Sequence, residues 1–290
     1  AAALGGIVLP INWRLSAEET VFNLTDCEPV FVFVDSEYQE MIAGVRDQLA
    51  SVRECYNLKP PSGKFSDFDA LLENDGLFEM PDVETDAGLV IIHTAAVAGR
   101  PRGALLSHGN LISANTHVNL LLNLSPDDVH LNILPLFHVA GLFMATAGFH
   151  AGALNLNMSK FDAGRAVDLI AEKKASFLFD FSPILSSILE EHEKSGKDIT
   201  SLQHVPGLEA PEVIDKYQEL TGGTFYSMYG QTETSAIATM ASYADKPGSA
   251  GRTIQLADVC LVDDYDRPLP PGKTGEITVK GPMVFKGYWN

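Results

Sequence analysis

The sequence has 290 residues, of which 46% are hydrophobic and 20% are charged, so it can bury a large core in one big domain or in a domain with a smaller companion. Lysine and arginine total 20 against 38 acidic residues, giving a formal net charge of −18. This composition excludes a disordered or fibrous chain, and the negative charge argues against nucleic acid and anionic membranes as partners.

The cysteines and the apolar stretches bear on compartment and membrane. Cys27, Cys55 and Cys260 are scattered and odd in number, without the paired spacing of a disulfide framework or a zinc site, so a reducing, cytoplasmic compartment is expected. Ala1–Val8 lacks the charged leader of a signal peptide. The longest apolar stretch, Val139–Phe149, is about half of the roughly 20 residues that a membrane span needs. It predicts a buried helix and no membrane span.

Short β-branched and aromatic runs alternate with helical patterns along most of the chain. The runs predict strands at Val30–Val34, Leu89–His93, Val129–Ile133, Ala153–Leu156, Ser176–Phe179, Leu202–Val205 and Thr224–Met228. The stretches between them predict helices at Asn110–Leu122, Ala163–Lys173, Pro183–Ser195 and Pro211–Thr221. Because alternating strands and helices favour parallel pairing, we expect an α/β fold of layered βαβ subdomains.

The tail has a different pattern. Val259–Val262 and Glu276–Lys280 read as strands separated by a turn, which predicts a small β-rich subdomain. We therefore expect an α/β core over residues 1–240 and a β-rich subdomain over residues 241–290. The chain opens on what reads as a helix end and stops directly after a strand-like run, so we interpret the core and the tail as truncated.

The segment His93–Gly103 follows an apolar strand, passes through small residues and reaches a helix predicted near His108–Asn110. Small side chains let successive backbone N–H groups converge on an anion, and Arg100 and Arg102 add positive charge. The segment therefore suits a phosphate cradle. An ordinary strand-to-helix loop explains it equally well when it is considered by itself.

A second polar cluster follows the predicted strand Thr224–Met228, in the run Tyr229-Gly-Gln-Thr-Glu-Thr234. Tyr229 offers a stacking face and Gly230 permits close approach of a ligand. Thr232 can donate to a phosphate oxygen, and Glu233 is a hard oxygen ligand for Mg²⁺. The ordinary interpretations are a core aromatic for Tyr229 and a solvated surface acid for Glu233.

Further motifs follow one another along the chain in a recognisable order. They are Gly6–Ser16, the small-residue loop Thr94–Gly103, Leu134-Pro-Leu-Phe-His-Val-Ala-Gly141, Gly207-Leu-Glu-Ala-Pro211, Tyr229–Thr234, Gly275–Pro282 and Gly287-Tyr-Trp289. Over nearly its whole length the chain resembles the AMP-binding, adenylate-forming superfamily, and most closely its fatty-acid and aryl acyl-CoA synthetases. The resemblance implies the large N-terminal domain of such an enzyme, in which ATP and a carboxylic acid give an acyl-adenylate and a thiol then releases AMP.

The resemblance also implies roles for particular residues. Catalytic contacts fall to His138, Thr232 and Glu233, with Mg²⁺ on Glu233. Nucleotide contacts fall to Thr94, Gly99, Arg102, Gly103, Gly207, Leu208, Glu209, Ala210, Tyr229, Gly230, Gln231 and Thr232. The implied small molecules are ATP or AMP, a fatty or aryl acid, and coenzyme A as co-substrate.

The chain departs from the family pattern in two ways. Its phosphate loop lacks two or three of the usual hydroxyl donors and has Arg102 where the family has lysine; each lost donor to a charged oxygen costs about 1.5–3 kcal/mol. The family's mobile C-terminal domain with its catalytic lysine is absent, so the isolated chain is not expected to complete thioester formation. A weak or inactive nucleotide-binding pseudoenzyme is therefore the alternative, and an unrelated α/β binding module ranks last. A homodimer is left open.

Overall fold

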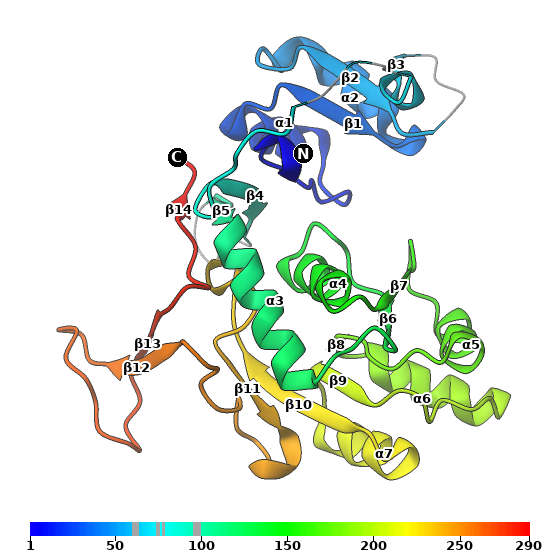
Figure 1. The fold of residues 1–290 in the computed structure, drawn as a ribbon, viewed down its shortest axis with the longest axis vertical. Coiled ribbons are helices and arrows are strands. Elements are labelled where there is room, and N and C mark those ends of the chain that lie inside the picture. Colours follow the sequence, from blue (N-terminus) through cyan, green and yellow to red (C-terminus); the bar gives the residue numbers. More distant parts are fainter. Residues whose placement is uncertain (60–63, 74–75, 77–78, 95–99) are drawn as a thin grey trace. The chain divides into compact units, whose positions relative to one another are not determined.

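The computed structural model describes residues 1–59, 64–73, 76, 79–94 and 100–290. The chain divides into two compact units, and Figure 1 shows the elements of both. Unit 1 comprises Ala1–Leu105 and Gly287–Asn290, and unit 2 comprises Leu106–Lys286. The division near residue 240 that the sequence suggests, between an α/β core and a β-rich subdomain, stays a prediction.

Unit 1 contains two helices, two small sheets and several short 3₁₀ turns within the described residues. Its helices and strands are α1 (Ala17–Cys27), β1 (Phe31–Val34), α2 (Gln39–Val45), β2 (Glu54–Asn57), β3 (Ser66–Asp67), β4 (Gly88–His93), β5 (Gly103–Ser107, which crosses into unit 2) and β14 (Gly287–Tyr288). One sheet has the order β1-β2-β3, with parallel pairing, and the other has the order β14-β5-β4.

Helix α1 was not among the helices expected from periodicity, although its start carries a sequence signal. The Ser16 hydroxyl accepts the Glu19 N–H at 3.3 Å, and the Glu19 carboxylate accepts the Ser16 N–H at 2.8 Å, which is a complete capping box. The apolar side of α1 packs into a core with β1, α2 and β2. This core consists of Leu24, Val34, Ile42, Leu49, Val52 and Cys55.

The segment after Gly103 corrects one expectation. The sequence predicted a loop that leads from the strand Leu89–His93 into a helix, whereas strand β5 lies between the loop and the helix. Ala104 and Leu106 are fully buried while Leu105 is half-buried, the alternation of a strand. The residues on both sides of positions 95–99, which lie outside the described residues, thus belong to two neighbouring strands of one sheet, and only Ser107 leads into the helix.

Unit 2 is built on a mainly parallel sheet. Its helices and strands are α3 (His108–Leu122), β6 (Val129–Asn132), α4 (Val139–Ala151), β7 (Leu154–Asn157), α5 (Ala163–Lys173), β8 (Asp180–Phe181), α6 (Ile184–Ser195), β9 (His204–Leu208), α7 (Pro211–Thr221), β10 (Thr224–Tyr229), β11 (Thr239–Ser242), β12 (Asp258–Val262) and β13 (Glu276–Lys280). Bridges from Phe177 to His130 and to His204 join β7-β6 to β8-β9-β10-β11. β11 is antiparallel to β10, and β12 and β13 form a separate two-stranded ribbon.

The two faces of the sheet bury different helices. Leu131 of β6 shares one core cluster with Val167 of α5, Ile188 of α6 and Ile214 of α7. The neighbouring residue on β6, His130, points to the other face, because successive side chains of a strand alternate. There its Nδ1 lies 2.7 Å from Asn155 Oδ1, and Asn155 lies against Gly148 of α4. α4 therefore covers the face opposite α5, α6 and α7.

Most of the predicted elements of unit 2 are confirmed, and α5 and α7 have the predicted bounds. Two strand predictions were displaced: Ser176–Phe179 gives way to β8 at Asp180–Phe181, and Leu202–Val205 to β9 at His204–Leu208. The apolar stretch Val139–Phe149 forms α4, as expected. Among the described residues, no helix combines the length and the hydropathy that a membrane span requires.

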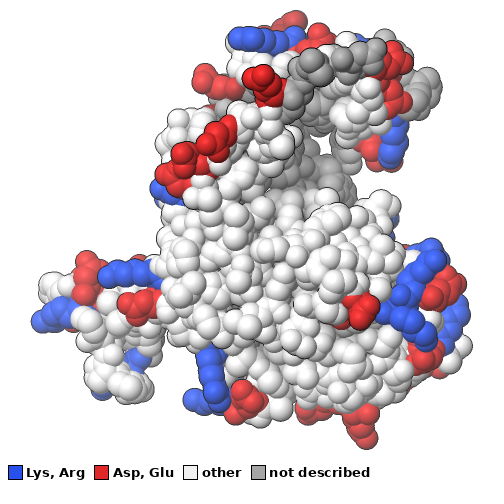
Figure 2. Space-filling view, in the orientation of Figure 1, with Lys and Arg blue, Asp and Glu red and all other residues white. Residues whose placement is uncertain are grey.

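Charged side chains gather over α5 and α6, where lysines and arginines lie among acidic residues (Figure 2). On α6, Glu191 pairs with Lys194 at 3.9 Å, and Glu193 pairs with Lys216 of α7 at 2.8 Å. Exposed pairs of this kind contribute at most about 1 kcal/mol each. We interpret this surface as a solvated face of the scaffold.

The start of α3 is tied to residues near the end of unit 2. Ser107 and Asn110 form a capping box, in which each side chain accepts the other residue's N–H. The Asn110 amide also donates to the carbonyls of Pro282 and Val284, at 2.8 and 2.9 Å. We call residues 281–285 the clamp segment. Asn110 thus holds the clamp segment against the first turn of α3.

Asn110→Ala is expected to lower the free energy of unfolding by about 2–4 kcal/mol, because it removes a helix cap and two hydrogen bonds of a buried amide. The matched control is Thr116→Ala on the same helix, where an exposed hydroxyl bonds only the Ile112 carbonyl; it should change stability by less than about 0.5 kcal/mol. Urea unfolding monitored by circular dichroism measures both. Equal effects of the two substitutions would contradict the clamp role of Asn110.

Candidate functional site

The carboxyl ends of β9 and β10, next to that of β8, bring two predicted motifs to one edge of the unit 2 sheet. Gly207 lies opposite Ser227 in the β9–β10 ladder, and Leu208 lies opposite Phe181 in the β8–β9 ladder. Residues 209–210 and 230–231 therefore leave neighbouring strands at the same edge. In parallel α/β sheets this edge is where ligands bind.

Two glycines of these motifs are required by close backbone contacts. A Cβ at Gly207 would lie 2.2 Å from the Asp180 carbonyl oxygen, and one at Gly230 would lie 2.0 Å from the Ala236 carbonyl oxygen. No side chain fits at either position without moving backbone. Gly207 thus lets β9 approach β8, and Gly230 lets the chain fold back on itself directly after β10.

The residues after Gly230 form a tight turn, Gln231–Ala236, which we call the Gln-Thr-Glu turn. Thr234 is buried, and its hydroxyl accepts the Gln231 N–H at 3.0 Å and donates to the Gln231 carbonyl at 3.1 Å. Ser235 and Ala236 have positive φ, 52° and 88°. Thr232 and Glu233 are half-buried at the start of the turn.

The clamp segment fixes the Gln-Thr-Glu turn from the other side. The buried Ser235 hydroxyl donates to the Met283 carbonyl at 2.7 Å. The Phe285 N–H donates to the Glu233 carbonyl at 2.9 Å. The backbone that carries Thr232 and Glu233 is therefore held in place by bonds that do not use the Thr232 and Glu233 side chains.

His138 lies at the same edge of the sheet, at the start of α4. Its Nδ1 accepts the Ala140 N–H at 3.3 Å and caps the helix, which places the ring proton of the neutral form on Nε2. Its ring meets Phe181 edge-on, with centroids 6.0 Å apart. Burial against its neighbours lowers the pKa of His138, although part of the residue stays open to solvent. Neither the cap nor Phe181 was predicted from the sequence.

Two carboxyl groups close to this edge, those of Asp180 and Glu209, were not predicted as a pair from the sequence. Asp180 is fully buried, and its Oδ1 accepts the Leu185 N–H at 2.9 Å. Its Oδ2 and Glu209 Oε2 are buried without a hydrogen-bond partner among the described residues. Burial, followed by repulsion from Glu209, raises the pKa of Asp180 to about 7 despite the Leu185 bond. Asp180 is therefore largely protonated below neutral pH and places a neutral carboxyl beside the Gly207–Ala210 segment.

The remaining predicted residues belong to unit 1. The Thr94 N–H donates to the Arg102 carbonyl at 3.0 Å and closes the base of the loop between β4 and β5. The Arg102 guanidinium stacks on the Tyr288 ring, 3.3 Å from its centroid. Gly103 begins β5, and Gly99 lies outside the described residues. These residues and the sheet edge belong to different units.

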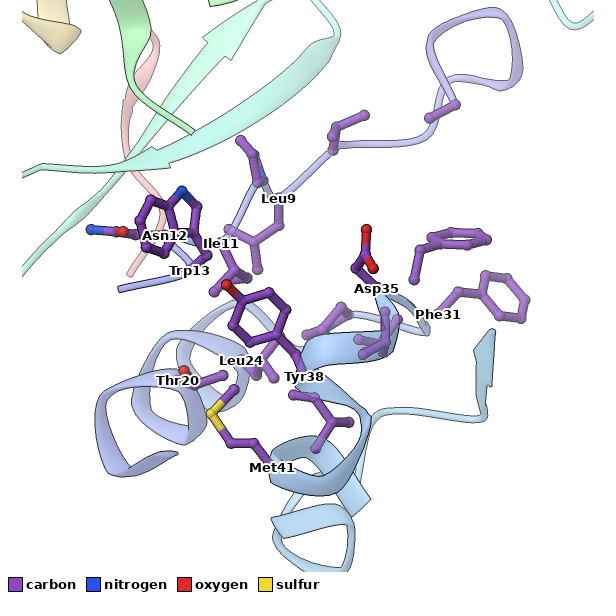
Figure 3. A pocket seen from close by; sticks show the side chains of 18 of the residues that line it. Leu9, Ile11, Asn12, Trp13, Thr20, Leu24, Phe31, Asp35, Tyr38 and Met41 are labelled. Atoms are coloured by element: carbon purple, nitrogen blue, oxygen red, sulfur yellow. The ribbon is translucent and has the colours of Figure 1, made fainter. Parts of the chain in front are cut away.

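Unit 1 also contains a cavity of about 460 Å³ that the sequence analysis did not anticipate (Figure 3). Apolar side chains such as Ile11, Leu24 and Met41 line most of it. The Thr20 hydroxyl, also in the lining, is buried without a partner among the described residues. None of the predicted nucleotide or catalytic residues that the structure describes lines this cavity.

The raised pKa of Asp180 predicts a pH-dependent stability. Between 3.8, the ordinary pKa of the carboxyl, and about 7, the folded state binds more protons than the unfolded state, so stability falls as pH rises through this window. Asp180→Asn cannot ionise and keeps an acceptor for the Leu185 N–H. Relative to the wild type, the free energy of unfolding of the Asp180→Asn variant should therefore increase by on the order of a few kcal/mol between pH 4 and pH 8.

Asp198→Asn provides the control for this pH series. Asp198 is exposed, and hydrogen bonds from Thr200, followed by one from Lys174, lower its pKa to about 2. Its contribution to stability therefore changes below pH 4, and its difference from the wild type should be flat between pH 4 and pH 8. Denaturant unfolding at several pH values measures both variants. A flat difference for Asp180→Asn would show that Asp180 is ionised in the folded state throughout.

Comparison with known proteins identifies the family of this chain. The sequence profile of the family described as AMP-binding enzyme matches residues 1–289. The indoleacetate–CoA ligase of Aromatoleum aromaticum is 35% identical over 297 residues, covering 100% of this chain and 58% of that protein. The feruloyl-CoA synthase of an Amycolatopsis species is 30% identical, covering 98% of this chain and 57% of that protein.

A solved structure extends the similarity to the fold. A protein from Rhodopseudomonas palustris, described as a long-chain-fatty-acid CoA ligase, matches with a TM-score of 0.94 and 41% identity, covering 100% of this chain and 72% of that one. The chain thus spans little more than half the length of the two curated relatives. The family profile covers the chain almost from end to end, and this chain belongs to the AMP-binding enzyme family.

Proposed function

We propose that this chain is the nucleotide- and acid-binding part of an AMP-forming acid–thiol ligase. The observation that carries the proposal is the sheet edge of unit 2, where Gly207–Ala210 and the Gln-Thr-Glu turn leave adjacent parallel strands. A ligand at such an edge meets backbone groups from both strands and side chains from the turn. Family membership and the names of the relatives support the same activity.

The proposed reaction has two steps. A carboxylate oxygen of the acid attacks the α-phosphorus of ATP, and the bond to the bridging oxygen breaks, so that pyrophosphate leaves with the electron pair. The thiol of coenzyme A then attacks the acyl carbon, and AMP leaves. The first step joins two anions, so donors fixed at the α-phosphate before the reaction are the natural catalytic device. The second step is not proposed for this chain by itself.

The residues of the sheet edge divide the first step among them. In the proposed arrangement, adenine lies between Tyr229 and the segment Gly207–Ala210. Gly207 and Gly230 allow the backbone to pack closely at these positions. Thr232 donates its hydroxyl to the α-phosphate. His138 donates its Nε2–H to the carboxylate, because its Nδ1 is already engaged in capping α4. The family resemblance adds a proposed phosphate-binding role for Thr94, Gly103 and Arg102, which belong to unit 1.

Glu233 fits a Mg²⁺ ion that accompanies the nucleotide. Its carboxylate is a hard oxygen ligand, it is half-buried, and its backbone is fixed by the Phe285 N–H. Mg²⁺ commonly binds through one or two carboxylates together with substrate phosphates. When bound, the ion would neutralise phosphate charge.

The acid is proposed to be an aryl or long-chain fatty acid. The relatives are named for indoleacetate and ferulate, and the solved structure for a long-chain fatty acid. The groups around His138 agree with an apolar substrate, because Phe181 packs against the imidazole ring and Phe179 packs against Phe181 with centroids 5.4 Å apart. A neutral Asp180 behind them adds no charge to that surface below neutral pH.

ATP–pyrophosphate exchange by the protein tests the proposal. With Mg²⁺, exchange should depend on one acid of a panel that includes indoleacetate, ferulate and a long-chain fatty acid. Glu233→Gln keeps the size of the side chain and should reduce exchange by about 100-fold. Glu212→Gln, an exposed acid at the start of α7, should leave it unchanged. Nucleotide binding without exchange for any acid would favour the pseudoenzyme instead.

Two substitutions at His138 separate helix capping from chemistry. His138→Ala removes both the cap and the ring, whereas His138→Asn keeps a capping acceptor. Alanine should cost about 1 kcal/mol of stability and asparagine should cost little. If the imidazole contacts the acid, both variants should lose at least about tenfold in acid-dependent exchange. Exchange at the wild-type rate in the asparagine variant would reduce His138 to a helix cap.

A further inference from the structure

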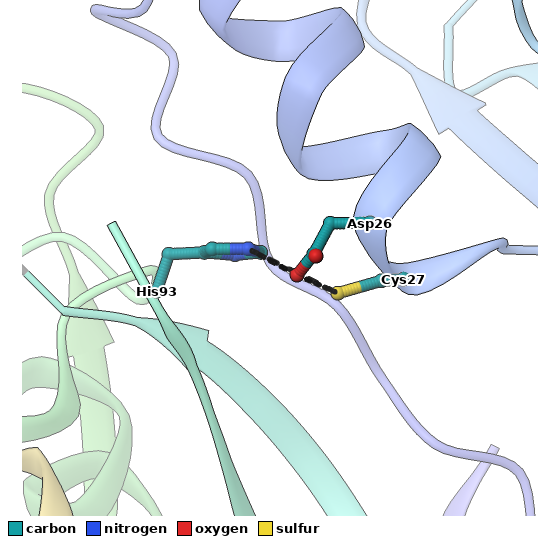
Figure 4. A group of neighbouring side chains, drawn as sticks. All are labelled: Asp26, Cys27 and His93. Carbon is teal, nitrogen blue, oxygen red and sulfur yellow. Dashed lines mark hydrogen bonds and ion pairs between the residues drawn. The ribbon is translucent and has the colours of Figure 1, made fainter. Parts of the chain in front are cut away.

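Three side chains of unit 1 converge outside the proposed nucleotide site (Figure 4). Asp26 and Cys27 end helix α1, and His93 ends strand β4. His93 Nε2 lies 3.7 Å from Asp26 Oδ2 and 3.9 Å from Cys27 Sγ, and Cys27 Sγ lies 4.0 Å from Asp26 Oδ2. Cys27 is buried and the His93 side chain is 9% exposed, whereas the Asp26 side chain is 25% exposed.

The three atoms form a nearly equilateral triangle. The His93–Asp26 separation of 3.7 Å exceeds that of an ordinary N–H···O hydrogen bond. A point in the plane of the triangle lies about 2.2 Å from all three atoms, close to the ~2.3 Å of a Zn–S bond and the ~2.0–2.2 Å of Zn–N and Zn–O bonds. The triangle therefore has the size that a shared metal ion requires, with only small side-chain movements.

The arrangement does not suit a cysteine nucleophile. In a nucleophile–histidine–carboxylate relay, the two ring nitrogens of the histidine serve different partners. Here a single nitrogen, Nε2 of His93, faces both the thiol and the carboxylate. Burial, followed by the charge of Asp26, also raises the pKa of the Cys27 thiol to about 12, so the free thiol is protonated at neutral pH. Convergence on one point is the geometry of ligands around a cation.

We propose that Asp26, Cys27 and His93 form a binding site for a divalent transition metal ion of the Zn²⁺ type. One sulfur, one imidazole nitrogen and one carboxylate oxygen make a donor set that such ions accept and that Mg²⁺ and Ca²⁺ do not. On binding, the Cys27 proton passes to solvent and the thiolate becomes a ligand. The fourth position is taken by water or a small ligand, which reaches the ion beside the partly exposed Asp26.

The site would connect two elements that are far apart in the sequence. Cys27 and His93 are 66 residues apart, and the ion would join the end of α1 to the end of β4. His93 directly precedes Thr94, the first residue of the predicted phosphate loop. The sequence argument against a zinc site used only the spacing between cysteines. Because the proposed donor set contains a single cysteine, that argument does not apply to it.

Titration of the metal-free chain with Co²⁺ tests the proposal without reference to ligase activity. One Co²⁺ per chain should bind and produce a thiolate-to-metal charge-transfer band, which Zn²⁺ should abolish by displacement. Cys27→Ser should remove the band. Asp26→Asn and His93→Gln, which keep the side-chain size, should each raise the dissociation constant for Zn²⁺ at least tenfold in competition with Co²⁺. Cys260→Ser, at a partly exposed cysteine, is the matched control and should keep the band.

Thermal unfolding of each variant without metal establishes whether the variant is folded. If Cys27→Ser does not fold, the Zn²⁺ affinities of Asp26→Asn and His93→Gln test the proposal. Zn²⁺ should raise the unfolding midpoint of the wild type and of Cys260→Ser, and leave Asp26→Asn nearly unchanged at the same concentration. The proposal is overturned by absence of the band, by a band that survives Cys27→Ser, or by a Zn²⁺ affinity that neither Asp26→Asn nor His93→Gln reduces.

Discussion

The hydrogen bonds between the clamp segment and the Gln-Thr-Glu turn are the constraint on which the candidate site depends. Left-handed backbone costs about 1–2 kcal/mol per non-glycine residue, and the turn contains two such residues in succession, Ser235 and Ala236. The Ser235 bond to the clamp segment, 48 residues later in the chain, helps to hold that conformation. Asn110 fixes the clamp segment in turn to the start of α3. Thr232 and Glu233 are thereby positioned by parts of unit 2 that carry no ligand contacts in the proposed function.

The parallel sheet explains why the motif residues meet. Strands that run in the same direction end at the same edge, so the segments after β9 and β10 become neighbours although α7 separates them in the sequence. Gly207 and Gly230 are needed because backbone oxygens occupy the space of a side chain at both positions. The glycines of the motifs thus serve the packing of the sheet edge as well as the approach of a ligand.

The elements that sequence predicted best are those with a strong local signal. α5 and α7 combine helical apolar spacing with clear ends, such as the Asp162 cap and the proline that begins α7, and their bounds were confirmed. β8 and β9 were displaced because strands buried on both faces lack the alternation that fixes register. α1 was missed although its capping box is legible in the sequence. β5 was not predicted, because it is short and its small and aliphatic residues indicate a strand only when the neighbouring strands β4 and β14 are known.

The candidate site was predictable to the extent that its residues stand in motifs ordered along the chain. Phe181 and Asp180 could not be found in this way, because they join the site through pairing of β8 with β9. The burial of Asp180 illustrates the consequence: its carboxyl is acidic in the unfolded chain and largely neutral below pH 7 in the folded one. The same reasoning applies to Asp26 and His93, whose chemistry depends on a distance that no spacing rule contains. Charge state and donor geometry are properties of the folded unit, and at these positions the side chains acquire them only through tertiary contacts.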